Sequence, residues 1–337
     1  MRFEFYSPDL DSLPKLSVDG TVPNSVHFSH WEGNETPAEL KADTSTEIVL
    51  NLVASPQYNK LTRGIELVTN NHFDTDGVLS VWTILNGARA LELREPLTAA
   101  AEAGDFSELS TEAGVKASIT IQGSDQAGND SQEGSPLGQY LNGGTPVDEA
   151  KAYELVLPEV EQVVTNVGAY EHLWRNGWQQ VAVAIESFEK GASRAEELDD
   201  VEMTLVTIAP EVFSPQGFDP AKHGAPVIAI SRYAHGKMFL IATPYANGWS
   251  YRFDYPYYSW AETMVRPRIQ RRDQTMLLSR LNEVEQNANG RWQLDGSEMT
   301  SAIKFVDKSN TPAASRLRPD EVAAIVREEQ LSKSAVT

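Results

Sequence analysis

Residues 64–92, GIELVTNNHFDTDGVLSVWTILNGARALE, combine an apolar run, a polar loop and a helical pattern. Its first six residues, 64–69, are mostly apolar and predict a short strand. Apolar side chains then recur at helical spacing, so residues 77–92 predict an amphipathic helix. The polar sequence between them, NNHFDTDG at 70–77, is therefore expected at the carboxyl edge of an α/β sheet, where ligands bind.

This loop carries three ionisable side chains at alternate positions, His72, Asp74 and Asp76. One imidazole and two carboxylates suit Mn²⁺ or Mg²⁺. Without a cation the carboxylates would repel each other, and a helix N-terminus offsets only about 0.3–1 kcal/mol per charge. We therefore expect these three residues to be metal ligands and catalytic residues, with Gly77 turning the backbone tightly into the helix. The alternative is structural: Asp74 or Asp76 caps the helix and His72 is an ordinary loop residue.

Residues 64–92 resemble the first motif of the DHH phosphoesterase superfamily, which is a strand, H-x-D-x-D-G, and a helix whose early residues are small or apolar. The resemblance implies that His72, Asp74 and Asp76 hold catalytic Mn²⁺ or Mg²⁺. The Asp-His-His triplet that names the superfamily is absent, and so is a glycine-rich motif containing His. The chain also resembles an uncharacterised bacterial protein family that carries HWEGNETP together with HFDTDG, and this second resemblance implies no function.

A second polar segment, FSHWEGNETP at 28–37, has the residue types of a binding loop. We expect His30 to join the catalytic residues, and Glu32 and Asn34 to contact substrate. A well-ordered surface loop is the alternative. Thr46 begins a helix that Thr44 and Glu47 predict as a capping box, and its hydroxyl could donate to a substrate phosphate. Ordinary capping explains the same residues.

Two further carboxylates, Asp105 and Asp125, are candidates for the ligand that bridges a two-metal site, although each also fits a turn or a cap. The dense basic cluster of the chain includes Arg266, Arg268 and Arg271. Planar guanidinium groups bind phosphate or carboxylate with two hydrogen bonds, so we expect these arginines to bind substrate. The alternative is a solvated turn that pairs with surplus acids.

The pattern along the chain predicts an α/β protein with a parallel N-terminal sheet, followed by an α+β part with antiparallel strands. The first 60 residues are rich in the turn formers Pro, Asn, Gly and Asp, and a helix is expected to begin near 43–46. Residues 115–122 (VKASITIQ) predict a strand, and 147–166 and 168–199 predict helices. We place an α/β domain with the metal site at 1–200, and a second domain at 201–337.

The second domain is expected to hold an antiparallel sheet and a charged C-terminal helix at 319–331. Its predicted strands include APVIAISRY and two apolar-aromatic runs joined near Ala246-Asn247-Gly248, where Asn-Gly predicts a hairpin. Helical spacing predicts one further helix at 275–286.

The composition of the chain argues against several classes of function. The 337 residues carry a net charge of −20, which argues against binding along duplex nucleic acid. The chain has no Cys, no apolar run long enough to span a membrane, and no pattern typical of a signal peptide, so we expect a cytoplasmic protein. A homo-oligomer is compatible with the sequence.

These observations favour a metal-dependent hydrolase, of phosphoesterase type, that acts on a small phosphoester or nucleotide. Two alternatives remain. One is a catalytically degenerate relative that binds a nucleotide or a protein, and the other is an interaction protein without metal.

Overall fold

The computed structural model describes residues 1–124, 135–138, 148–210, 219–220, 224, 226–296 and 300–334, without the side chains of 330–334. The chain divides into two compact units. The first unit holds the described residues up to Trp178 together with Trp260–Arg268, and the second holds the remainder. We call Trp260–Arg268 the inserted segment, because residues of the second unit precede and follow it in the sequence. The predicted boundary at residue 200 assigns this segment to the second domain.

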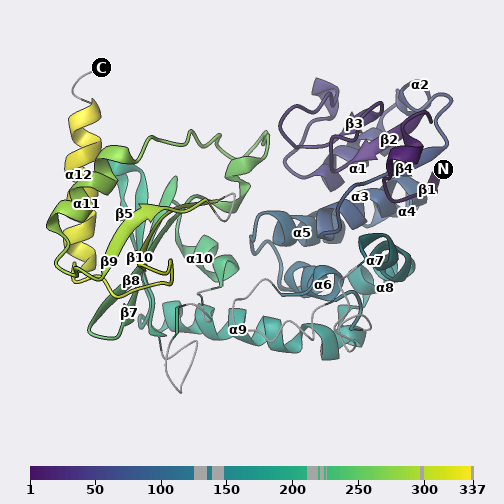
Figure 1. Ribbon diagram of the computed structural model, residues 1–337. Coiled ribbons are helices and arrows are strands. Elements are labelled where there is room, and N and C mark those ends of the chain that lie inside the picture. Colours follow the sequence, from purple (N-terminus) through teal and green to yellow (C-terminus); the bar gives the residue numbers. More distant parts are fainter. Residues whose placement is uncertain are drawn as a thin grey trace. The chain divides into compact units, whose positions relative to one another are not determined.

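The first unit contains four short strands and most of the helices (Figure 1). Its elements are β1 Arg2–Phe3, β2 Lys15–Val18, β3 Val26–Phe28, α1 Ser45–Ala54, α2 Tyr58–Leu61, β4 Leu67–Thr69, α3 Thr75–Asn86, α4 Ala88–Glu92, α5 Arg94–Asp105, α6 Glu112–Gln122, α7 Glu149–Val156, α8 Val160–Thr165 and the first part of α9 Glu171–Glu189.

The four strands form an entirely parallel sheet in the order β1-β4-β2-β3. Strands β2 and β4 are buried along their whole length. Helices α1 and α3 pack side by side, and α3 also packs on α5. Their apolar side chains share one core with the strands, which includes Leu16, Val68, Leu50 and Leu79. The α/β class expected from the sequence is therefore observed, with a parallel sheet at the N-terminus.

Residues 64–92 contain the expected strand and helix. The predicted strand at 64–69 is β4, and the predicted helix at 77–92 is α3 followed by α4. Thr44 and Glu47 form the predicted capping box of α1, since each side chain accepts a backbone N–H from the other residue.

The loops and the helix expected in the first 60 residues are observed, but the sequence did not predict the short strands β1, β2 and β3 among them. These strands have only two to four residues. Strand β2 reads KLSV, and Lys15 is buried like its neighbours. The Lys15 Nζ donates to backbone carbonyls, including those of Leu10 at 3.0 Å and Asn24 at 3.2 Å. These contacts satisfy a buried charge that a sequence pattern would place at the surface.

Two predicted strands are helices. Residues 115–122 belong to α6, whose first turn is capped by the Thr111 hydroxyl accepting the Gly114 N–H. Most side chains of α6 are buried, so the apolar spacing of an amphipathic helix is lost. APVIAISRY also ends in a helix, α10 Val227–Tyr233, because a short apolar run does not distinguish strand from helix.

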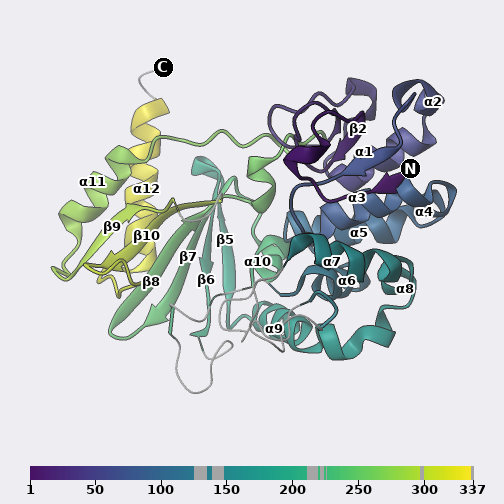
Figure 2. The same ribbon diagram turned by 45° about the vertical axis from the view of Figure 1, so that its right-hand side comes forward.

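The second unit is built on a six-stranded sheet in the order β5-β6-β7-β8-β10-β9 (Figure 2). All neighbours are antiparallel except β6 and β7. Its elements are the second part of α9, β5 Arg194–Leu198, β6 Met203–Thr207, α10, β7 Met238–Tyr245, β8 Gly248–Asp254, α11 Thr275–Val284, β9 Gly290–Leu294, β10 Ser301–Asp307 and α12 Pro319–Ser334.

Alternate side chains of this sheet enter different cores. Leu240 joins the core that includes residues of α11 and α12, whereas Ile241 joins the core of α10. The predicted hairpin is confirmed, since Tyr245 of β7 pairs with Gly248 of β8. The predicted helix at 168–199 is too long, because α9 ends at Glu189 and β5 follows. No helix in the described ranges is long and apolar enough to cross a membrane.

Candidate metal centre

The carboxyl ends of three neighbouring strands in the first unit bring ionisable side chains together. Asp19 directly follows β2, His30 follows β3, and the loop with His72 and Asp74 follows β4. Since the strands are parallel and adjacent, all three loops emerge at one edge of the sheet. Asp105, the last residue of α5, reaches the same place.

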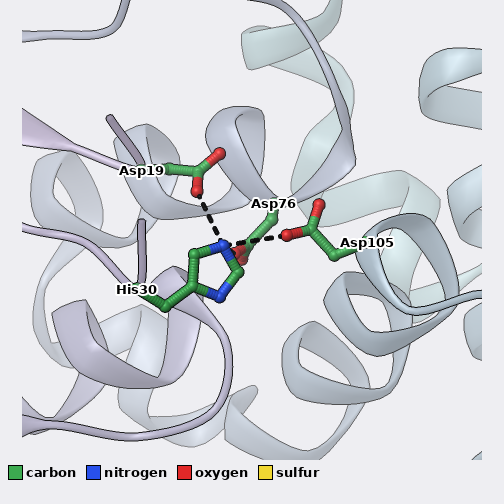
Figure 3. Close-up of side chains that lie close together, drawn as sticks. All are labelled: Asp19, His30, Asp76 and Asp105. Atoms are coloured by element: carbon green, nitrogen blue, oxygen red, sulfur yellow. Dashed lines mark ion pairs between the residues drawn. The ribbon is translucent and has the colours of Figure 1, made fainter. Parts of the chain in front are cut away.

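An inner cluster consists of Asp19, His30, Asp76 and Asp105, all buried (Figure 3). The His30 Nε2 lies 3.0 Å from Asp105 Oδ2, 3.4 Å from Asp19 Oδ1 and 3.8 Å from Asp76 Oδ2. One ligand atom from each of the four residues lies within 4.8 Å of the others. Three carboxylates and one imidazole thus surround a single point.

An outer cluster consists of Asp19, His72 and Asp74. The His72 Nε2 lies 3.0 Å from Asp74 Oδ2 and 3.1 Å from Asp19 Oδ2. The side chains of His72 and Asp74 are 23% and 30% exposed, so this cluster is open to solvent whereas the inner cluster is closed. Asp19 belongs to both clusters, with Oδ1 toward His30 and Oδ2 toward His72.

The donor set fits a divalent cation. Asp19 Oδ1, His30 Nε2 and Asp105 Oδ2 are buried, and none has a hydrogen-bond partner among the residues that the structure describes. His30 Nε2 and Asp105 Oδ2 are close but not aligned for a hydrogen bond. The other ring nitrogen, Nδ1, lies 2.6 Å from the carbonyl oxygen of Asp43, which can only accept, so Nδ1 carries the proton. With the Nδ1 proton fixed in this way, Nε2 is the ring nitrogen whose lone pair is presented to a metal once its own proton is lost.

The close approach of these ionisable side chains also shifts their pKa values. Burial and neighbouring carboxylates raise the pKa of Asp105 to about 7 and that of Asp76 well above its usual range. Burial opposes charge on His72, but Asp74 and Asp19 outweigh it and raise the His72 pKa to about 11. Buried carboxylates likewise hold the pKa of His30 high. In the metal-free protein these groups therefore hold protons that a cation would displace.

Asp74 and Asp76 each belong to a cluster and also accept hydrogen bonds from the N-terminus of a helix. Asp74 is the N-cap of α3, because its Oδ1 accepts the Gly77 N–H at 2.7 Å, while its Oδ2 faces His72. Asp76 accepts the N–H groups of Ser45 at 2.7 Å and Thr46 at 2.8 Å, at the start of α1. Helix capping and cluster membership are thus not alternatives for these carboxylates.

The prediction for Gly77 needs a different physical reason. Gly77 lies within the first turn of α3, and its φ is not in the left-handed region. A Cβ here would lie 2.5 Å from Asn70 Nδ2 and 2.7 Å from Tyr153 Oη. Residue 77 is therefore glycine because neighbouring side chains occupy the space of a Cβ, and not because the backbone turns tightly.

The inserted segment packs against the residues that support the inner cluster. The Asp43 carboxylate accepts the backbone N–H groups of Met264, Val265 and Arg266 and pairs with the Arg266 guanidinium at 2.8 Å. The N–H of Glu262 donates to the His30 carbonyl at 2.8 Å, and the Trp260 ring meets the His30 ring edge-on at 5.0 Å.

The predicted substrate-binding arginines have different surroundings. The Arg266 guanidinium pairs with Asp43, Glu102 and Glu108, which assigns it a structural role. Arg268 is exposed in the first unit, and Arg271 lies in the second unit over the Tyr255 ring at 5.3 Å.

The remaining predicted residues divide between the site and its surroundings. Glu32 is exposed and is in neither cluster. Asn34 donates to Glu262 Oε2 at 2.9 Å in the inserted segment. Thr46 contacts Asp76 through both its N–H and its hydroxyl. Asp125 lies outside the described residues.

Asp19 was missed from the sequence, although it takes part in both clusters. It follows a strand that was itself missed, and 53 positions separate it from His72. The one available signal was an Asp-Gly pair at 19–20 after an apolar segment, which predicts only a turn.

By fold and by this arrangement, the chain is an α/β protein with a candidate metal centre at the carboxyl edge of a parallel sheet. It belongs to the family of unknown function DUF6687, whose model matches residues 1–332. No match was found among curated proteins.

Proposed function

We propose that the protein is a metal-dependent hydrolase, of phosphoesterase type, that acts on a small phosphorylated or nucleotide substrate. The observation that carries the proposal is Asp19, whose two carboxylate oxygens face two different sets of metal-ligating side chains. A carboxylate that bridges two cations is the arrangement of two-metal phosphoester hydrolysis. The resemblance of HFDTDG to the first DHH motif points to the same reaction class.

The residues have distinct proposed roles. Asp19, His30, Asp76 and Asp105 hold the inner ion, and Asp19, His72 and Asp74 hold the outer ion, with Mn²⁺ or Mg²⁺ as the expected metal. Such ions supply polarisation of a phosphoryl oxygen and activation of water. Since His72 and Asp74 are partly exposed, the outer cluster is the side on which substrate would bind.

The chain's own groups complete the proposed chemistry. His30 presents Nε2 because the Asp43 carbonyl holds the proton on Nδ1, and the N-terminus of α1 holds Asp76 through two N–H groups. Arg268 remains the exposed candidate in the first unit for the substrate's negative charge. The absence of Cys fits the reducing cytoplasm, where we propose the protein acts.

The first experiment measures bound metal and turnover together. Protein purified without chelator, or titrated with Mn²⁺, should bind about two ions per chain and hydrolyse at least one member of a phosphoester panel. Asp19→Asn should lose both ions and activity, whereas Asp74→Asn should lose mainly the outer ion. Asp9→Asn, an exposed carboxylate of the first unit, is the matched control.

The outcomes separate the candidate functions. Wild-type protein that binds neither Mn²⁺ nor Mg²⁺ would overturn the proposal. Metal binding without turnover of any phosphoester, together with a nucleotide that raises the melting temperature, would favour a degenerate binding protein instead. That second candidate is retained because the Asp-His-His triplet is absent.

A further inference from the structure

Two hydrogen-bond donors are buried beside the outer cluster. The Tyr153 hydroxyl comes from α7, and the Asn70 amide comes from the loop that follows β4. Both side chains are 0% exposed. Neither Tyr153 Oη nor Asn70 Nδ2 has a hydrogen-bond partner in the described part of the chain. Native proteins pair nearly all such groups, directly or through ordered water.

The two donors converge on the same place. The position that a Cβ would take on Gly77 is 2.5 Å from Asn70 Nδ2, 2.7 Å from Tyr153 Oη and 3.1 Å from Asp74 Oδ1. Two donors and one carboxylate oxygen thus surround one backbone position at the start of α3. The two unpartnered donors and the Asp74 carboxylate oxygen are therefore neighbours in the protein interior.

Packing holds both donors in place. The Tyr153 ring lies 4.6 Å from the ring of Phe3 and 5.4 Å from that of Phe73, measured between centroids. Asn70 uses its Oδ1 to accept the His72 backbone N–H at 3.0 Å, which leaves its Nδ2 toward Gly77. Rotation away from this place would therefore break existing contacts.

We propose that Tyr153 and Asn70 hold a buried water molecule that donates to Asp74, and that Tyr153 thereby acts as a positioning residue for the outer metal ion. A water oxygen accepts from both donors through its two lone pairs and gives a proton to Asp74 Oδ1. Asp74 Oδ1 then receives the Gly77 N–H and the water, so that Oδ2 stays directed at His72. The positioning role for the outer metal ion rests on the proposed function, whereas the presence of the buried water does not depend on it.

The test compares two tyrosines whose hydroxyl oxygens are buried. Tyr153→Phe removes the hydroxyl and keeps the ring. Tyr233→Phe is the matched control, because Tyr233 Oη is also buried without a partner among the described residues, and its ring stacks on Phe188 in the second unit. Both variants are measured for the melting temperature of the metal-free protein and for Mn²⁺ affinity.

Tyr153→Phe should lower the metal-free melting temperature, because the water loses a partner. It should also weaken Mn²⁺ at the outer position about 10–100-fold while the inner position stays unchanged. Tyr233→Phe should change neither affinity. A crystal structure of the wild-type protein should show an ordered oxygen between Tyr153, Asn70 and Asp74.

Each contrary result is decisive. If Tyr153→Phe is as stable as the wild-type protein or more so, the hydroxyl was unpaired and the water is excluded. If stability falls but Mn²⁺ affinity is unchanged, the positioning role is excluded. If the wild-type protein binds no Mn²⁺ or Mg²⁺, the proposed function and the positioning role fail together, and the stability of Tyr153→Phe still decides whether the water exists.

Discussion

Gly77 has no side chain, and this allows the side chains of Asn70 and Tyr153 to approach the start of α3. A glycine within a helix normally costs about 0.5–1 kcal/mol relative to alanine, because it loses more conformational entropy. Here the space of a Cβ is occupied by Asn70 Nδ2 and Tyr153 Oη. This steric clash decides whether replacing Gly77 by alanine raises or lowers the stability of the protein.

We predict that Gly77→Ala destabilises the protein by about 1–3 kcal/mol, since both neighbours are buried and cannot move freely. The free energy of unfolding from urea denaturation measures this change. Gly168→Ala is the control, because no atom lies within 4 Å of a Cβ at that position and its φ is not positive. Equal stability of Gly77→Ala and the wild-type protein would show that Asn70 and Tyr153 move aside.

At the scale of elements, the inserted segment depends on Asp43. This carboxylate is 3% exposed and accepts three backbone N–H groups as well as the Arg266 guanidinium. Burial raises its pKa, but these hydrogen bonds outweigh burial and hold the pKa below its usual value. A depressed carboxylate pKa stabilises the folded protein above the pKa of the unfolded chain, and this stabilisation is lost as pH falls through the folded value.

We therefore predict that Asp43→Asn destabilises the protein by about 3–5 kcal/mol at pH 7, because Arg266 loses a buried partner. The difference from wild type should shrink as pH falls below about 4, where Asp43 of the unfolded chain takes up a proton, and it should be lost once pH falls through the lower pKa of folded Asp43. Chemical denaturation at several pH values measures both effects. Asp320→Asn, whose carboxylate is exposed, should change stability little. A difference that does not depend on pH would exclude ionised Asp43 as the cause.

The elements also explain what the sequence could predict. The strand, loop and helix around HFDTDG were predicted because the strand is apolar, the loop is polar and the helix is amphipathic. Strands β1 to β3 were not, because they are short and β2 buries Lys15. His30 and Asp76 were both selected from the sequence, but only the parallel pairing of β2, β3 and β4 brings them to Asp19. Long-range pairing of short strands leaves no local pattern.

At the scale of the whole molecule, the carboxylates of the two clusters contribute to a large negative net charge. The chain carries a net charge of −20, and four of its carboxylates lie in the two clusters. Without metal, the raised pKa values of Asp105, Asp76, His30 and His72 mean that bound protons offset this charge. Metal and protons must then compete for the same lone pairs. The pH dependence of metal binding follows from this competition.

We predict that Mn²⁺ binding at pH 7 releases protons, and that affinity rises with pH because His72, with a pKa of about 11, is protonated in the metal-free protein. Isothermal titration calorimetry in two buffers of different ionisation enthalpy gives the number of protons released. His72→Gln should release about one proton fewer. His172→Gln, which changes an exposed histidine outside both clusters, should release the same number as the wild-type protein. A binding enthalpy that is identical in both buffers would mean that no protons are released, so the cluster ligands would already be unprotonated. In that case the burial of uncompensated carboxylates, rather than competition with protons, would set the affinity for metal.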